Sequence, residues 1–208
     1  AFKNIIINFG KLGYDITFKM LDAADYNVPQ NRKRVFIVGI KKTLKKKFIF
    51  PSIDLFKSQM TLNDAIGDIN FAIPAKPKNK TNETDFKSNQ IPNNEYMTGS
   101  FSSMYMSRNR VRTWNEPSFT IQAGGRHAPI HPDELKMKKI DKDKFSFHNK
   151  SKARRLSVRE CARIQTFPDT FLFKYKNLSD GYKMIGNAVP VMLSKILAKE
   201  ISRQIFNK

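Results

Sequence analysis

Cysteine, histidine and acidic side chains are scarce in this chain of 208 residues. Its single cysteine, Cys161, excludes a disulfide framework and any zinc site built from several cysteines, and three scattered histidines add little ligand capacity. We therefore expect no metal site. No apolar run approaches the roughly 20 residues that a membrane span needs, and the first residues show no signal-peptide pattern. These absences predict a soluble protein in a reducing, intracellular compartment.

The shortage of acidic residues leaves the chain strongly basic. It has 38 Lys and Arg against 18 Asp and Glu, which gives a formal net charge of +20 at pH 7. This excess is larger than solubility requires and predicts a polyanionic partner. A genome that enriches surface lysine is the alternative explanation of the charge. Hydrophobic residues make up 40% of the chain, so we expect a packed core rather than disorder.

The order of elements at the start of the chain is typical of an α/β sheet. Residues 2–13 form an amphipathic pattern closed by glycines, which predicts the later turns of a helix. Residues 14–21 alternate like a half-buried strand, and residues 34–40 form a continuous apolar run like a central strand. Because the first residue is Ala1 and a helix follows at once, we expect the chain to begin inside a domain.

Three further helices are expected. Thr61 followed three residues later by Asp64 predicts the capped start of a short helix, and Ser157 followed by Glu160 predicts another that runs to about Thr166. The last one covers 190–206, where apolar side chains recur near helical spacing and should pack one face against a core.

The remaining segments are expected to be loops and short strands. Residues 41–47 carry five lysines and predict a solvated connection that would also favour nearby phosphates. Residues 71–94 are rich in Pro, Lys, Asn and Thr, which predicts a long loop. Between 100 and 131, short apolar alternations are broken by Gly and Pro, which predicts short strands and tight loops.

Three separated segments carry recognisable motifs. They read Pro-Gln-Asn-Arg-Lys-Arg at 29–34, Arg-Leu-Ser-Val-Arg-Glu-Cys-Ala-Arg-Ile-Gln-Thr-Phe-Pro-Asp at 155–169, and Tyr-Lys-Met-Ile-Gly-Asn-Ala-Val-Pro at 182–190. In this order they resemble the Q-x-R-x-R, R-x-L-(S/T)-x-R-E-x-x-R-(L/I)-Q-x-F-P and G-N-(A/S)-V-P signatures of DNA cytosine-C5 methyltransferases of the bacterial restriction-modification type. The first motif is weak alone, the second is long and specific, and the third follows at the expected distance.

The resemblance implies an α/β fold. It would combine the C-terminal part of an S-adenosylmethionine-dependent, Rossmann-like sheet domain with a small, irregular, mostly-β target recognition domain. We expect residues 1–60 to be the last strands of the catalytic domain and residues 61–178 to be the recognition domain with its hinge helix. Residues 179–208 would return to the catalytic domain, so the two ends of the chain should meet in space.

Arg32 and Arg34 are the residues predicted to act at the target base. Methylating C5 of a stacked cytosine requires the base to be flipped out, at a cost of a few kcal/mol. The two arginines can point to the same side, and the resemblance implies that they contact the flipped nucleotide and its phosphates. A pair of surface arginines in salt bridges is the alternative.

Asn187, Ala188 and Val189 are the predicted cofactor-binding residues. The resemblance implies that this turn lies against the methionine part of S-adenosylmethionine, and an Asn amide can hydrogen-bond a carboxylate. Taken alone, these residues also fit an ordinary Gly-Asn turn before a helix that starts at Pro190.

The central segment, residues 106–114 and 118–127, combines Arg, Asn, Gln, Ser and Thr with glycines, which is the side-chain chemistry of DNA recognition. Arg pairs with guanine, Gln and Asn pair with adenine, and Gly lets the backbone approach closely. It resembles the corresponding part of enzymes that recognise short G·C-rich palindromes. Trp114 is interpreted as a core anchor rather than a stacking platform. The residues predicted to contact double-stranded DNA are Gln30, Arg108, Arg110, Arg112, Gln122, Gly124, Gly125, Arg126 and Arg155.

The second motif is interpreted as architectural. Arg159, Glu160 and Arg163 lie at helical spacing and can form ion pairs with one another and with neighbouring loops. Cys161 lies inside the same helix with no histidine close in sequence, so we expect a small buried residue rather than a nucleophile.

The residues that perform the chemistry in this family are missing from the chain. It has no Gly-rich cofactor turn, no Pro-Cys dipeptide and no Glu-Asn-Val segment. In the family all three precede the first motif, so we expect this chain to need an N-terminal half, in the same polypeptide or as a separate subunit. The chain alone should be inactive, and its unpartnered apolar surface should make it poorly soluble.

Two other functions fit parts of the pattern. A non-catalytic, sequence-specific DNA-binding module could retain the fold without the chemistry. A generic RNA- or ribosome-binding protein could use the lysine loops alone, although the order of the motifs argues against it. The leading hypothesis places the protein in the bacterial cytoplasm, at the nucleoid.

Overall fold

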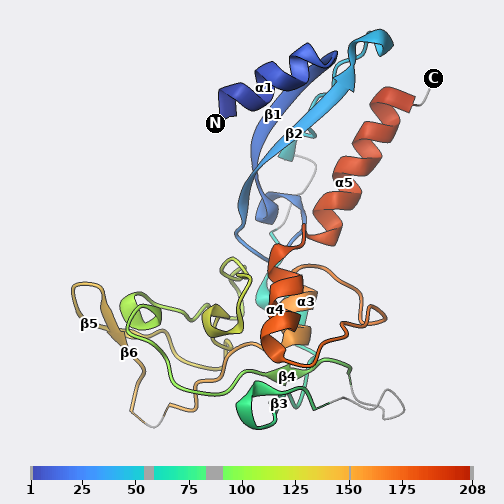
Figure 1. Ribbon diagram of the computed structural model, residues 1–208. Coiled ribbons are helices and arrows are strands. Elements are labelled where there is room, and N and C mark those ends of the chain that lie inside the picture. The colour runs from blue at the N-terminus through green and yellow to red at the C-terminus, as the bar shows by residue number, and fades with distance from the viewer. Residues whose placement is uncertain (1, 54–58, 83–90, 150, 207–208) are drawn as a thin grey trace.

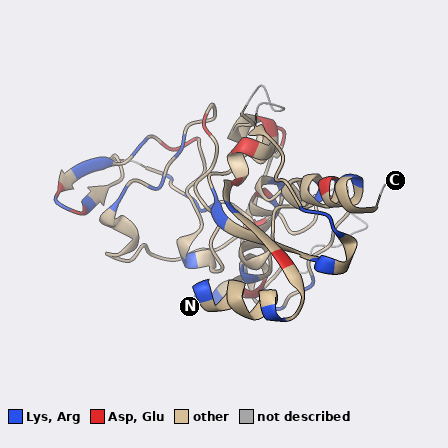
Figure 2. Ribbon diagram, turned by 90° about the horizontal axis from the view of Figure 1, so that it is seen from above, with Lys and Arg blue, Asp and Glu red and all other residues tan. Residues whose placement is uncertain are grey.

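The computed structural model describes residues 2–53, 59–82, 91–149 and 151–206. Figure 1 shows a hairpin flanked by helices α1 and α5 above a region that holds α3, α4 and several short elements. No helix within these ranges is long and apolar enough to span a bilayer. Lys and Arg are spread over the whole molecule and are dense on a protruding hairpin formed by β5 (Lys138–Asp141) and β6 (Lys144–Ser146), as Figure 2 shows.

The upper region is built from helix α1 (Phe2–Lys11) and a long antiparallel hairpin of β1 (Tyr14–Asp22) and β2 (Lys33–Lys41). The helix and both strands confirm the expectation from the sequence. The burial expected of a central strand is wrong for β2, because Val35 and Ile37 are 50% and 38% exposed. The reason is that β2 pairs only with β1, in a sheet of two strands.

The last helix packs onto this hairpin. Helix α5 (Val191–Ile201) continues into a π-helical turn (Ser202–Phe206). Leu193 and Leu197 of α5 share one hydrophobic cluster with Leu21 of β1. The hairpin and the last helix therefore form a common core, as expected.

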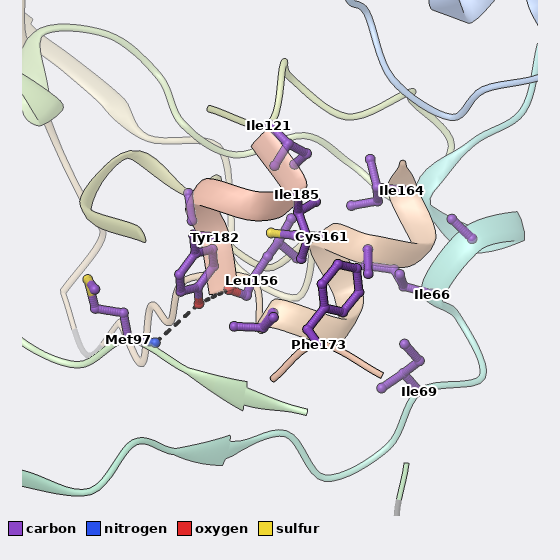
Figure 3. Close-up of a cluster of buried hydrophobic side chains, with 14 of the residues drawn as sticks. Ile66, Ile69, Met97, Ile121, Leu156, Cys161, Ile164, Phe173, Tyr182 and Ile185 are labelled. Atoms are coloured by element: carbon purple, nitrogen blue, oxygen red, sulfur yellow. Dashed lines mark hydrogen bonds between the residues drawn. The ribbon is translucent and has the colours of Figure 1, made fainter. Parts of the chain in front are cut away.

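A second core lies below and holds the two capped helices and α4 (Leu178–Asn187). The predicted capping boxes are both present, at the start of α2 (Leu62–Ile66) and of α3 (Val158–Ile164). Tyr182 of α4 is fully buried, donates to the Leu156 carbonyl (2.7 Å) and accepts from the Met97 N–H (3.2 Å), as Figure 3 shows. Helix α4 packs in this second core, whereas α5 packs against the hairpin, so residues 179–208 contact both regions. The domain boundaries expected from the sequence remain a prediction.

The region expected to be mostly β is largely irregular. Its strands are the parallel pair β3 (Ile73–Pro74) and β4 (Glu95–Tyr96) and the hairpin of β5 (Lys138–Asp141) and β6 (Lys144–Ser146). The expectation of short strands between 100 and 131 is wrong, since these described residues hold only isolated bridges and two 3-10 turns. The 3-10 turns of the chain include Ala23–Tyr26, Lys42–Leu44, Pro77–Asn79, Tyr105–Ser107 and Gly125–His127.

The long loop expected over 71–94 is present in its described part, apart from the two residues of β3 and the 3-10 turn Pro77–Asn79. A small third cluster holds the irregular region together. It is formed by Tyr105, Val111, Ile130 and Met137. With so few strand hydrogen bonds, these loops depend on side chains that bond to backbone groups, and arginines provide many of those bonds.

Candidate functional site

The first motif, the third motif and the central segment meet at one buried arginine. Arg32, 6% exposed, donates from Nη1 to the Ile121 carbonyl (2.9 Å). Its Nη2 donates to the carbonyls of Gly186 (2.8 Å) and Ala188 (3.4 Å). One guanidinium therefore joins the first motif to the third motif and to the central segment.

Two buried glutamines reinforce this junction. The side-chain oxygen of Gln30 accepts from the Ile121 N–H (2.8 Å), and its amide donates to Gln165 (3.1 Å). Gln165 in turn donates to the Ile185 carbonyl (2.9 Å). Gln30 was predicted to contact DNA, but it is fully buried, so its side chain is not accessible to DNA. The amide is retained inside because its polar atoms are satisfied by the protein.

Gly186 brings the turn of the third motif into direct contact with the central segment. A Cβ at this position would overlap the Gln122 carbonyl group and lie 2.5 Å from the Ala123 nitrogen. These are backbone atoms, which cannot rotate away as a side chain can. Glycine is therefore required here by close approach of two backbones.

Arg32 and Arg34 have different surroundings although they are two residues apart. Burial, and to a smaller extent the nearby charge of Arg34, together lower the pKa of Arg32 to about 10. Arg32 stays protonated at neutral pH, and its terminal N–H groups donate to backbone carbonyls. Arg34 is exposed, and its guanidinium donates locally, to the Lys33 carbonyl (2.7 Å). Of the two arginines predicted to contact the nucleotide, Arg34 has the exposed side chain.

Arg34 lines an open pocket of about 430 Å³ together with residues of the central segment. Arg108 and Gln122, both exposed, lie in its wall. Arg110 also borders it but is 7% exposed and donates to the Tyr105 carbonyl (2.7 Å). The full lining is Arg34, Arg108, Asn109, Arg110, Phe119, Thr120, Gln122, His127 and Pro129.

Other predicted DNA contacts are partly or fully occupied inside the protein. Arg112 pairs with Glu116 (2.9 Å) and lies 4.3 Å from the centre of the Phe119 ring. Arg155 is 4% exposed and donates to the carbonyls of Gly99 (3.0 Å) and Ser100 (2.9 Å). Both guanidinium groups hold loops in place.

Arg126, Gly124 and Gly125 are the remaining residues that were predicted to contact DNA. Arg126 is exposed and lines a second pocket, of about 570 Å³, that Arg155 also borders. Gly124 is half-buried. Gly125 is buried, and a Cβ there would lie 2.6 Å from the ring of Tyr182, so this glycine is required by packing.

The turn predicted to hold the cofactor is open to solvent. Asn187 ends α4 with an exposed side chain, and Val189 is 47% exposed. The Ala188 N–H is bonded to the Ile185 carbonyl (3.1 Å), which fixes the turn. An exposed amide beside exposed apolar surface fits the amino-acid end of S-adenosylmethionine, which has a carboxylate and a methylene chain.

The second motif is bonded to its neighbouring loops. Arg159 is fully buried and donates to the carbonyls of Pro92 (2.8 Å), Pro168 (3.2 Å) and Phe171 (2.9 Å). Glu160, also fully buried, receives two bonds of 2.8 Å from Arg154.

Arg163 of the same motif pairs with Asp169 (2.6 Å) and with Asp68. Within the described residues no ion pair joins Arg159, Glu160 and Arg163 to one another, so that part of the expectation is wrong. Their partners lie in loops because loop carbonyls and carboxylates otherwise lack hydrogen-bond partners.

Cys161 and Trp114 behave as the sequence indicated. Burial raises the pKa of the Cys161 thiol well above its usual value, and the residue is 0% exposed. It therefore fills space in the second core. Trp114 packs partly buried against the same core and donates its indole N–H to Asp133 (3.1 Å). In the described ranges no cluster of His, Cys, Asp or Glu is arranged to hold a metal ion.

The residues that sequence reasoning missed are those that hold the junction. Gln165 lies inside the second motif, but no local pattern distinguishes it from an ordinary polar helix residue. Its partner Gln30 is 135 positions away. Phe119 and Thr120 line the open pocket and lie inside the segment that the sequence had marked as DNA-reading.

Comparisons with known proteins identify the family of this chain. The family model "C-5 cytosine-specific DNA methylase" matches residues 1–203. The Type II methyltransferase M.MthTI of Methanothermobacter thermautotrophicus is 56% identical over 98% of this chain and 61% of its own length. M.FnuDI of Fusobacterium nucleatum is 50% identical over 100% of this chain and 61% of its length. The chain thus spans about three-fifths of these relatives.

Solved structures share the fold. A prophage-encoded DNA modification methyltransferase (E. coli) aligns with a TM-score of 0.65 at 22% identity, over 99% of this chain and 65% of that chain. The Entamoeba histolytica methyltransferase EhMeth aligns with a TM-score of 0.61 at 13% identity, over 99% of this chain and 59% of that chain. At these identities the likeness concerns the fold, which is the α/β fold of methyltransferases. The match of the family model over residues 1–203 shows that this chain belongs to the C-5 cytosine-specific DNA methylases.

Proposed function

We propose that this chain is the DNA-recognising, C-terminal part of a DNA (cytosine-5-)-methyltransferase, which transfers a methyl group from S-adenosylmethionine to C5 of a flipped cytosine. The observation that carries the proposal is the open pocket. It joins Arg34 of the first motif to Arg108 and Gln122 of the central segment. The turn with Asn187 lies next to it, since Gly186 contacts the backbone of Gln122.

The pocket offers the donors that DNA recognition needs. Arg34 and Arg108 present guanidinium groups that match phosphate oxygens or the major-groove edge of guanine. Gln122 presents an amide that can pair with adenine or accept from cytosine. Arg34 lies two residues after Arg32, which is bonded to the cofactor turn, so we assign Arg34 to the flipped nucleotide. We assign Arg108 and Gln122 to the duplex. The net charge of +20 supports double-stranded DNA as the partner.

Asn187, Ala188 and Val189 would hold one end of S-adenosylmethionine, which supplies the methyl group when it is bound. Asn187 would donate its side-chain amide to the cofactor carboxylate, and Val189 would cover its methylene chain. Arg32 keeps this turn in place through the carbonyls on either side of Asn187.

The nucleophile must come from elsewhere in the enzyme. Cys161 is the single cysteine of the chain, and its thiol is buried in the second core with a raised pKa. Cytosine methylation at C5 needs a thiolate that adds to the ring, and a buried thiol of high pKa cannot supply it. We therefore assign the thiolate to an N-terminal half, in the same polypeptide or as a separate subunit.

Exposed apolar side chains in the upper region support a docking site for that half. Phe18 and Met20 of β1 are 52% and 64% exposed, Val35 of β2 is 50% exposed, and Ile7 of α1 is 52% exposed. Apolar side chains gathered on neighbouring elements mark interaction surfaces. We expect the chain by itself to associate or precipitate and to become soluble with its other half.

The direct test is methyl transfer. Purified chain is incubated with duplex DNA and labelled methyl donor, alone and together with the N-terminal half. Incorporation is expected only in the reconstituted mixture, and incorporation by the chain alone would refute the assignment of the nucleophile. DNA binding without incorporation in the mixture would instead favour the alternative, a non-catalytic, sequence-specific DNA-binding module. An enzyme of this kind would act in the bacterial cytoplasm, at the nucleoid.

A further inference from the structure

We propose that Arg32 is a positioning residue that couples DNA binding to cofactor binding, an inference that rests on the proposed function. Its guanidinium is bonded to one carbonyl of the central segment, at Ile121, and to two carbonyls of the cofactor turn, at Gly186 and Ala188. It therefore does not touch a substrate itself. It holds the two surfaces that would touch them at a fixed separation.

The geometry requires an arginine. The guanidinium is a rigid planar fork, so its two terminal nitrogens can serve two segments at once. Here Nη1 serves Ile121 and Nη2 serves the turn around Asn187. A lysine has one compact ammonium group on a flexible stem and cannot span the same acceptors in the same way. The backbone of Arg32 is itself held, because its N–H donates to the Asp22 carboxylate (2.8 Å).

The central segment has little freedom to move alone at this point. Both backbone groups of Ile121 are engaged, the N–H by Gln30 (2.8 Å) and the carbonyl by Arg32 (2.9 Å). The next residue, Gln122, lines the open pocket with its side chain and touches Gly186 with its backbone. Any shift of Gln122 toward DNA must therefore be followed at Gly186 and by the turn beyond it.

A shared support of this kind links the two binding equilibria. If DNA holds the central segment in one position, the cofactor turn is held in the matching position, and less ordering is left for the cofactor to impose. Linkage requires the effect to be equal in both directions, so the cofactor must raise the affinity for DNA by the same factor. A contact network shows that such coupling is possible, and only a measured coupling factor establishes it.

The experiment measures that factor in the complete enzyme. S-adenosylhomocysteine, which cannot donate a methyl group, is titrated calorimetrically into the enzyme with and without the duplex that it methylates. The ratio of the two dissociation constants is the coupling factor, expected to be roughly 5- to 150-fold in the wild type. Arg32→Lys should bring the ratio to within about twofold of one, because the shared support is lost.

Two further variants separate coupling from general damage. Arg159→Lys alters another buried arginine that holds loop carbonyls, but none of its partners lies in the central segment or the cofactor turn. It should lower stability and leave the ratio unchanged. Gly186→Ala pushes the turn away from Gln122 and should lower the ratio while the protein still folds, which keeps the test valid if Arg32→Lys does not fold.

The outcomes are distinct. A wild-type ratio of one, or a ratio that survives both Arg32→Lys and Gly186→Ala, overturns the coupling role of Arg32. A fall of the ratio in Arg159→Lys equal to that in Arg32→Lys overturns it as well, because the effect would then be general. Failure of the wild-type enzyme to bind the cofactor product or DNA at all would speak against the proposed function instead.

Discussion

The segment around helix α3, residues 154–169, is rich in arginine, and so is the open pocket, yet the two regions use arginine in opposite ways. We call this segment the block. In the block, Arg154 and Arg159 are bonded to buried carboxylate or carbonyl groups of the protein. In the pocket, Arg34 and Arg108 are exposed. An arginine of a signature motif can therefore contact a ligand only where the fold leaves its guanidinium exposed.

Burial accounts for the difference. A buried guanidinium without partners is costly, so the fold surrounds it with carbonyls and carboxylates. Once bonded in this way, it contributes to structure and is no longer available to DNA. Arg32 lies between the two extremes, since it is buried and bonded, but its bonds join the two surfaces proposed to bind ligands.

Arg154→Met is expected to cause the largest loss of unfolding free energy in the block. It would leave the fully buried Glu160 carboxylate without its guanidinium partner, at a cost of about 3 to 5 kcal/mol of unfolding free energy. Arg163→Met is the matched control, because its partners Asp68 and Asp169 have side chains 71% and 40% exposed. That change should cost about 1 kcal/mol or less. Urea unfolding of the complete protein measures both, and equal losses would contradict the comparison.

Gly186→Ala tests the contact between the pocket and the cofactor turn. The added methyl group meets the backbone of Gln122 and Ala123, so we expect a loss of about 1 to 3 kcal/mol. Gly10→Ala provides the control, since no heavy atom lies within 4 Å of a Cβ there and α1 should gain about 0.5 to 1 kcal/mol. Thermal or urea unfolding of both variants gives the difference, and a neutral Gly186→Ala would show that the backbones can separate freely.

Arg34→Gln and Arg108→Gln address the pocket itself. Each should weaken DNA binding by about 1 to 3 kcal/mol if the side chain reads a base, or reduce the salt dependence by about one counterion if it contacts a phosphate. Stability should stay within about 0.5 kcal/mol of the wild type, because both residues are exposed. Binding isotherms at several salt concentrations provide the measurement. Arg163→Gln, in the block, should leave DNA affinity unchanged, and a loss there equal to that in the pocket would remove the distinction.

The smallest expected effect is a pH dependence of stability caused by His131, which contacts Glu160 of the block. Burial lowers the pKa of His131 below its usual value, against the attraction of Glu160, while Arg154 lowers it and Asp133 raises it. A histidine with a lowered pKa contributes its full stability above the unfolded value of about 6.5 and loses it as pH falls toward the folded value.

His131→Gln should therefore flatten the fall in urea midpoint as the pH drops below about 6.5. His148→Gln serves as the control, because His148 is a more exposed histidine at the rim of the irregular region. Identical pH profiles for the wild type and His131→Gln would show that the buried imidazole is not the group responsible.

Local chemistry made several elements predictable. The capping boxes at Thr61 and Ser157 depend on residues three positions apart, so they could be read directly and are present as expected. The same holds for β1 and β2, whose apolar patterns need only their own sequence. The burial of β2 could not be predicted, because it depends on which strands lie beside it.

The family and the order of the motifs were determined by the sequence by itself, because signature residues are recognisable wherever they lie. The division of those residues into bonded and exposed was decided only by the tertiary structure. Gln30 and Arg34 are four positions apart in one motif, yet one is fully buried against Ile121 and Gln165, while the other lines the open pocket. The physical reason is that burial and hydrogen bonding depend on partners roughly 90 to 155 positions away, which no local pattern specifies.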